Sequence, residues 1–307
     1  MTENRHRTLF LAGLATLLLL VPLPSMGRAA DAAQDLAHLP VGALYAVLLL
    51  GWLRRTRGLS PLVAALLAFF LVSVFLGIVE IVQPYVGRTR SIQDWGVGVL
   101  GAGSGLVVVL AWEHGVAARI VGLVVGIALF ALGAFPAGRI LYDVWRQRRA
   151  APMIASFEDD LELTRWYFGH ATARRVGPHA TSGLYSLRVD LEPAQYPGAT
   201  MSSPLTDWRG YRALALELYV DEGEPLEFVL TVSDEEHDGD YFDRFNQEMR
   251  LGPGKHLIRI PLAEIEAEPR GRSMDMGRIA GFQVFVVDPD RPRTFYLDAV
   301  RLLGRGP

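Results

Sequence analysis

Seven polar residues stand at the ends of apolar segments in the first half of the chain, namely Asp35, His38, Glu80, Gln83, Arg88, Ser91 and Asp94. Glu80 and Gln83 are three residues apart, so a helix presents both on one face. An ionisable side chain at membrane depth is costly, which makes this group a candidate functional site. The group could bind a polar headgroup, relay protons, or hold helices together through hydrogen bonds. His38, close to Asp35, is a candidate for acid–base chemistry.

A second group with useful chemistry lies in the more polar half of the chain and consists of Tyr241, Asp243, Arg244 and Asn246. A sugar ring stacks on an aromatic side chain, and charged or amide groups hold its hydroxyls. The acidic loop 234–240 precedes this group. In the alternative interpretation, Tyr241 and Phe242 pack partly in the core, Arg244 is a structural ion-pair partner, and the acidic loop is solvated.

Several function classes find no support in the sequence. The chain has no cysteine, which excludes disulfides, thiolate catalysis and thiolate metal sites. Its net charge of −3 is too small to argue for a nucleic-acid partner. Neither a Ser-His-Asp arrangement nor a metal-ligand spacing, a phosphate loop or a dinucleotide fingerprint is present. An enzyme is therefore less favoured than a binding protein.

The elements that must position the first group are apolar segments of membrane-spanning length, which is about 20 residues. We predict five spans, at 8–26, 39–53, 61–82, 95–112 and 116–141. Arg5 and Arg7 precede the first, so a cleaved signal peptide is the alternative for it. In the fourth, Gly101 and Gly105 are four residues apart, a spacing that lets helix backbones pack closely.

The arginines predict how the chain crosses the membrane. Arg5, Arg7 and the basic cluster at 54–57 favour the cytoplasmic side. With an uncleaved first helix, five spans place the C-terminal half outside, so we predict a multi-pass protein of the bacterial inner membrane with a periplasmic C-terminal domain. The arginines in 146–149 argue against this orientation, because they follow the fifth span.

Together with Gly101 and Gly105, the spacing of the seven polar residues resembles the VanZ-like family, which is named for a protein associated with resistance to the glycopeptide teicoplanin. The resemblance covers about residues 8–112. Leu36 stands where family members usually carry a lysine, and Gly98 where they usually carry an asparagine. The resemblance implies a small multi-span protein of the cell envelope and supplies no established reaction.

After residue 149 the pattern changes to short alternating runs separated by turn residues, which is typical of an all-β domain. In 211–219, apolar residues occupy alternate positions, so one face of that strand is buried. We predict a two-sheet jelly-roll sandwich. Its ten strands are expected at 153–158, 166–168, 171–176, 184–191, 211–219, 226–233, 242–250, 255–261, 281–287 and 294–303.

The segments FED at 157–159, DWRGY at 207–211 and YLDAVRL at 296–302 resemble the galactose-binding-like jelly rolls of many carbohydrate-binding modules. In such modules a calcium ion often connects the first strand to the last. The resemblance implies Glu158 and Asp298 as ligands of a structural calcium, because carboxylate oxygens suit this ion. The alternative is that both carboxylates are solvated or pair with arginines.

The predicted organisation is a VanZ-like transmembrane helical domain at 1–145, a linker at 146–152, and a galactose-binding-like β-sandwich at 153–307. The function favoured is recognition of a glycan or another envelope component by a membrane-anchored protein. An assembly or scaffold component comes second, and a membrane-embedded acid–base enzyme acting on a lipid headgroup third. The expected partners are the lipid bilayer and a glycan or envelope polymer, without nucleic acid, and the oligomeric state is left open.

Overall fold

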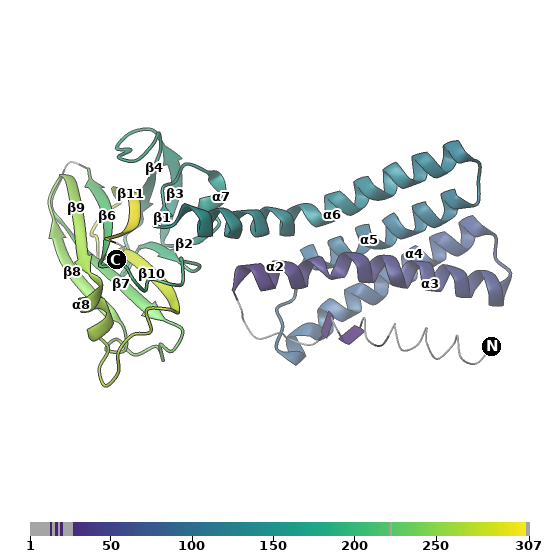
Figure 1. Ribbon diagram of the computed structural model, residues 1–307, viewed down its shortest axis with the longest axis horizontal. Coiled ribbons are helices and arrows are strands. Elements are labelled where there is room, and N and C mark those ends of the chain that lie inside the picture. The colour runs from purple at the N-terminus through teal and green to yellow at the C-terminus, as the bar shows by residue number, and fades with distance from the viewer. Residues whose placement is uncertain (1–12, 14–15, 18, 21–26, 222, 305–307) are drawn as a thin grey trace. The chain divides into compact units, whose positions relative to one another are not determined.

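The computed structural model describes residues 13, 16–17, 19–20, 27–221 and 223–304. It divides into two compact units, Met1–Tyr142 and Asp143–Pro307. The first is helical, and the second contains two β-sheets (Figure 1). The predicted first span, 8–26, lies outside the described residues apart from five positions within it.

Among the described residues, four helical segments are long and apolar enough to cross a membrane: Arg28–Arg57, Pro61–Val86, Ile92–Trp112 and Val116–Ala150. They comprise α2 (Arg28–Leu36), α3 (His38–Arg57), α4 (Pro61–Val82), the 3-10 helix η1 (Gln83–Val86), α5 (Ile92–Trp112) and α6 (Val116–Ala150). Each contains one of the predicted spans after the first. A fifth span is not confirmed in the part of the chain that the structure describes.

Local sequence signals set the ends of these helices. Gly58 ends α3 in the left-handed conformation (φ 60°), which glycine adopts without steric cost. Pro61 occupies the first turn of α4, where its missing N–H is not needed. Ser91 caps α5, since its side-chain oxygen accepts a hydrogen bond from the Asp94 amide.

Glycines let α3 and α5 approach each other closely. A Cβ atom built on Gly101 would lie 2.0 Å from the backbone oxygen of Leu39, and one on Gly42 would lie 2.0 Å from the oxygen of Gly98. Gly105 faces Ala43, with a contact of 3.2 Å. The small residues of the fourth predicted span therefore serve helix packing, as the small-xxx-small spacing indicates.

The second unit is built from antiparallel strands in two sheets. One has the order β3-β4-β11-β6-β9 with β1 paired to β11, and is called sheet A; the other has the order β2-β5-β10-β7-β8 and is called sheet B. The strands are β1 (Met153–Ala155), β2 (Trp166–Gly169), β3 (Ala171–Val176), β4 (Ser186–Leu191), β5 (Gly198–Met201), β6 (Ala213–Val220), β7 (Leu226–Asp234), β8 (Phe245–Leu251), β9 (Gly254–Pro261), β10 (Ile279–Val286) and β11 (Arg293–Leu303).

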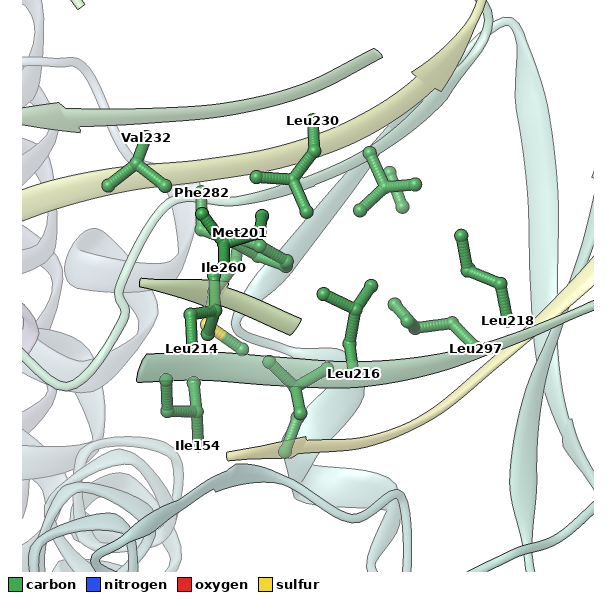
Figure 2. Close-up of a cluster of buried hydrophobic side chains, with 14 of the residues drawn as sticks. Ile154, Met201, Leu214, Leu216, Leu218, Leu230, Val232, Ile260, Phe282 and Leu297 are labelled. Carbon is green, nitrogen blue, oxygen red and sulfur yellow. The ribbon is translucent and has the colours of Figure 1, made fainter. Parts of the chain in front are cut away.

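The core lies between the two sheets. Side chains from β6 and β11 of sheet A point toward side chains from β7 and β10 of sheet B (Figure 2). Leu214, Leu216 and Leu218 alternate along β6 and are fully buried, as the apolar alternation predicts. The predicted two-sheet sandwich is confirmed, and the outward residues of β6 are left free to form a site.

Several details differ from the sequence-based expectation. The predicted strands 153–158 and 184–191 are shorter than expected, because β1 ends at Ala155 and β4 begins at Ser186. The sequence did not predict β5, because its four residues are too few to show an alternation of apolar and polar side chains. The short helices α7 (Asp160–Leu163) and α8 (Leu262–Ala267) were also not predicted. The predicted strand 242–250 begins only at Phe245, because residues 241–244 form a turn that closes on Asn246.

The second unit begins within α6, since the helix continues to Ala150 through most of the predicted linker 146–152. Arg165 donates two hydrogen bonds to the Asp143 carboxylate, at 2.6 and 2.9 Å, and both side chains are buried. Arg165 also donates to the Ile154 carbonyl oxygen at 3.2 Å. This bidentate pair fixes the end of α6 to the first strand of the sandwich unit.

Candidate functional site

Three of the predicted polar residues meet at one end of the helical unit. His38 begins α3, Glu80 lies near the end of α4, and Asp94 lies in the first turn of α5. One ligand atom of each lies within 4.8 Å of those of the other two. The residues are 1%, 4% and 5% exposed, respectively. A histidine and two carboxylates thus form a compact buried group, which we call the His-carboxylate cluster.

Backbone groups hold two members of the cluster in place. His38 Nδ1 lies 3.1 Å from the Asp35 carbonyl oxygen, which can only accept, so Nδ1 is the donor. The Ser91 amide donates to Glu80 Oε2 at 2.9 Å. Ser91 therefore orients Glu80 through its backbone while its side chain caps α5.

The remaining atoms of the cluster are available for a ligand. His38 Nε2 and Glu80 Oε1 lie 3.4 Å apart, and neither atom has a hydrogen-bond partner among the described residues. A buried polar atom without a partner is costly and needs an explanation. The two free atoms are close neighbours, so a proton or a cation shared between them would satisfy both.

The other predicted residues of this group have different surroundings. Gln83 Nε2 donates to the Leu19 carbonyl oxygen at 3.2 Å, and Arg88 donates to the same oxygen. Asp35 contacts the cluster through its backbone oxygen. The seven predicted residues thus separate into the His-carboxylate cluster, its backbone supports, and a pair that holds the Leu19 carbonyl.

The predicted ligand group of the sandwich is largely occupied by contacts within its own turn. Arg244 Nε donates to Asn246 Oδ1 at 2.9 Å, and Asn246 Nδ2 donates to the Tyr241 carbonyl oxygen at 2.8 Å. Arg272 lies 2.5 Å from Asp243 and lowers the pKa of that carboxyl to about 2 through their hydrogen bonds. Tyr241 is 48% exposed and remains accessible to a ligand.

The acidic loop around this group is also structured by its own residues. Arg272 bridges Asp243 to Asp234, whose side chain lies 2.6 Å from the guanidinium. His237, Asp238 and Asp243 bring their ligand atoms within 4.8 Å of one another, but these residues are more exposed than the His-carboxylate cluster. We call these three residues the comparison site.

The carboxylates of Glu158 and Asp298 hold one loop of the sandwich. Asp298 Oδ2 accepts hydrogen bonds from the Thr181 amide at 2.6 Å, the Thr181 hydroxyl at 2.8 Å and the Ser182 amide at 2.9 Å. Glu158 Oε1 accepts from the Leu184 and Tyr185 amides, both at 2.9 Å. The arrangement anchors the loop; calcium binding stays a prediction.

A pocket of about 220 Å³ opens on the outer face of sheet A, and sequence reasoning did not predict it. Its aromatic walls are His179, Tyr219 and Tyr296. The His179 ring stacks on Tyr219 with centroids 3.5 Å apart, and its edge contact with Tyr296 has a centroid distance of 4.5 Å. Tyr219 and Tyr296 are direct partners across β6 and β11. We call this the aromatic pocket.

Charged groups line the same pocket. Lys255 Nζ lies 2.6 Å from Glu217 Oε2, and Arg301 lies 3.6 Å from the other oxygen. Burial alone would raise the pKa of Glu217, but the hydrogen bond and charge of Lys255 lower it below its ordinary value. Burial raises the pKa of Tyr296. The pocket thus presents aromatic rings, a carboxylate and an ammonium group in one small volume.

The alternation of buried and outward residues along β6 could have indicated part of this pocket from the sequence. Glu217 and Tyr219 alternate with the buried apolar residues of β6, so they face away from the core. The sequence did not show that β11 pairs with β6, or that the loop carrying His179 folds over Tyr219.

No protein-family model matches the chain, and no curated protein matches it. Solved structures similar to the C-terminal half include carbohydrate-binding modules. The family 11 module of a cellulosomal cellulase of Clostridium thermocellum is 18% identical, with a TM-score of 0.38, over 50% of this chain and 95% of that one. A structure described as an exo-beta-agarase is 16% identical, with a TM-score of 0.41, over 50% of this chain; the match spans a quarter (25%) of the agarase chain.

A third similar structure concerns the promiscuous specificity of carbohydrate-binding modules from the β-sandwich superfamily. It is 15% identical, with a TM-score of 0.36, over 48% of this chain and 60% of that one. In its described residues the chain combines four candidate membrane-spanning helices with an antiparallel β-sandwich, and the solved structures similar to it include carbohydrate-binding modules and agarases.

Proposed function

We propose that this chain is a membrane-anchored glycan-binding protein and that the aromatic pocket of sheet A is its binding site. The observation that carries the proposal is the juxtaposition of Tyr219, Tyr296 and His179 with Glu217 and Lys255 around one cavity. Aromatic rings offer an apolar surface for the C–H face of a sugar, and charged side chains offer acceptors and donors for its hydroxyls.

The size of the pocket limits what it can hold. Its volume of about 220 Å³ is below the range of about 300–1,000 Å³ that is usual for drug-sized ligands. A single sugar ring, at a chain end or along a polymer, fits this scale. The Tyr241–Asn246 turn, with its exposed tyrosine, is a second surface for the same polymer.

The helical unit supplies the membrane anchor of this proposal. The exposed apolar side chains of α4, such as Leu62, Leu66 and Phe70, suit contact with lipid tails. We assign the bundle a VanZ-like character because of its polar cluster and its close-packed glycines. We place the sandwich on the periplasmic side of a bacterial inner membrane, because Arg5, Arg7 and the basic cluster at 54–57 favour the cytoplasmic side. A C-terminal reporter fusion that functions in only one compartment tests this placement.

The binding test uses the full chain in detergent micelles against an array of polysaccharides and envelope glycans. We expect binding that Tyr219→Ala weakens by about ten- to a hundredfold, since burial of an aromatic side chain contributes about 1.5–3 kcal/mol. The matched control is Tyr167→Ala, which removes a 67% exposed tyrosine from sheet B.

Equal weakening by both variants would show that the aromatic pocket is not the site. A wild-type chain that binds no glycan would contradict the proposed function and favour an assembly role in which both units dock other proteins.

A further inference from the structure

We propose that His38, Glu80 and Asp94 bind a divalent transition-metal ion of the zinc type. The proposal concerns the helical unit and does not depend on glycan binding. It rests on the geometry of the His-carboxylate cluster, on its backbone supports, and on the two buried atoms that lack partners.

The hydrogen bond of His38 determines which ring nitrogen is free. Nδ1 donates to the Asp35 carbonyl, so in the neutral ring Nε2 carries the lone pair. Histidine ligands of metals characteristically donate their other ring nitrogen to a backbone carbonyl or a carboxylate, which fixes the tautomer and the ring orientation. The ring of His38 has this arrangement, with Nδ1 bonded to the Asp35 carbonyl and Nε2 free.

The free atoms of the cluster are two acceptors that lie close to each other. The lone pair of His38 Nε2 and the Glu80 Oε1 oxygen are 3.4 Å apart in a buried site, so they repel unless a proton or a metal ion is shared between them. A proton on either residue would remove the repulsion, and so would a metal ion. The second carboxylate, from Asp94, favours the ion, because a divalent charge is offset by two carboxylates.

The distances suit a small metal ion. Zinc lies about 2.0–2.2 Å from nitrogen and carboxylate ligands, so two ligands of a tetrahedral site are about 3.4 Å apart. The Nε2–Oε1 distance of 3.4 Å equals this spacing. All three ligand atoms lie within 4.8 Å of one another, and rotation of the Asp94 carboxylate can shorten the longer separations.

The ligand types select the class of metal. One imidazole with two carboxylates favours zinc, manganese or iron over magnesium and calcium, which prefer oxygen ligands alone. Three protein ligands leave a fourth position for water or for an oxygen of a bound molecule. Since the cluster lies where α3 and α5 begin and α4 ends, that position is near one end of the spanning helices.

The test uses the full chain, purified in detergent without a polyhistidine tag, stripped of metal and titrated with Co²⁺. A tetrahedral nitrogen–oxygen site gives visible Co²⁺ absorption that Zn²⁺ abolishes by competition. We expect one such site per chain. His38→Gln, Glu80→Gln and Asp94→Asn each should weaken Co²⁺ binding at this site at least tenfold.

Two matched controls separate this site from other binding. His237→Gln makes the same change in the comparison site of the sandwich, and Asp31→Asn makes the same change as Asp94→Asn at an exposed position of α2. Both should retain the absorption. Circular dichroism shows whether each variant keeps its helices, and the spectrum of the wild-type chain remains decisive if one does not.

Absence of the absorption in the wild-type chain would overturn the proposal. Absorption that survives in His38→Gln but disappears in His237→Gln would overturn it as well, because the metal would then bind in the sandwich.

Discussion

The close approach of α3 and α5 makes Gly101→Ala an informative change. The new methyl carbon would lie 2.0 Å from the backbone oxygen of Leu39, whereas ordinary contacts begin at 3.4 Å. The obstacle is a main-chain atom, so a side-chain rotation cannot relieve it. The helices must separate by more than an ångström. Because this separation also moves Gly42 away from Gly98, their close contact is lost together with that of Gly101 and Leu39.

Two effects of opposite sign contribute to the expected stability change. Alanine favours the helix over glycine by about 1 kcal/mol. Overpacking in a well-packed interface costs about 1–3 kcal/mol, and more where the backbone itself must move. We therefore expect Gly101→Ala to lower the free energy of unfolding by about 1–2 kcal/mol.

Gly96→Ala in the same helix is the matched control. Nothing lies within 4 Å of its new methyl group, so only the gain in helix propensity remains. Unfolding of the full chain in detergent, followed by circular dichroism, should give a lower midpoint for Gly101→Ala and an unchanged or higher one for Gly96→Ala. Equal midpoints for the two variants would refute the packing that brings His38 to Asp94.

Three further changes test the sandwich unit, each by unfolding of the full chain in detergent. Asp143→Asn leaves the buried Arg165 without its charged partner and should cost about 3–5 kcal/mol; a loss below 1 kcal/mol would contradict the buried pair. Asp298→Asn removes the charged acceptor of the Thr181 loop and should lower the free energy of unfolding by about 1.5–3 kcal/mol. We also expect faster proteolysis in that loop, and unchanged cleavage would argue against the anchoring role. The lowered pKa of Asp243 contributes stability that is present above its ordinary value of 3.8 and is lost as the pH falls toward about 2. Asp243→Asn should flatten this acid transition, whereas an identical pH profile would show that other carboxylates cause it.

Local signals in the sequence were sufficient for most of the elements. The bounds of α4 were predicted as they are, because Pro61 marks the first turn and the apolar run ends where Gln83 begins η1. The strand β3 was also predicted with its observed bounds. Alternation identified the buried face of β6. β5 was missed because its four residues have neither the length nor the alternation of a strand signal.

The sites were less predictable than the elements, because they depend on contacts between distant segments. His38, Glu80 and Asp94 were identified as candidates, but so were Gln83 and Arg88, which bind the Leu19 carbonyl instead. Burial and side-chain direction separate these groups, and neither follows from spacing alone. Tyr219 and Tyr296 are far apart in sequence and meet only through the register of β6 and β11.

In the His-carboxylate cluster the chemical groups are positioned by residues that have no chemistry of their own. Gly101 of α5 and Gly42 of α3 let the two helices lie close together, so that His38 reaches Asp94. A change at Gly101 therefore acts on the cluster without altering any ligand atom. If the cluster binds a metal, Gly101→Ala should weaken Co²⁺ binding as well as stability, and Gly96→Ala should leave both intact. A Gly101→Ala chain that is destabilised yet binds Co²⁺ with wild-type affinity would show that the ligands hold their geometry independently of the glycine contact.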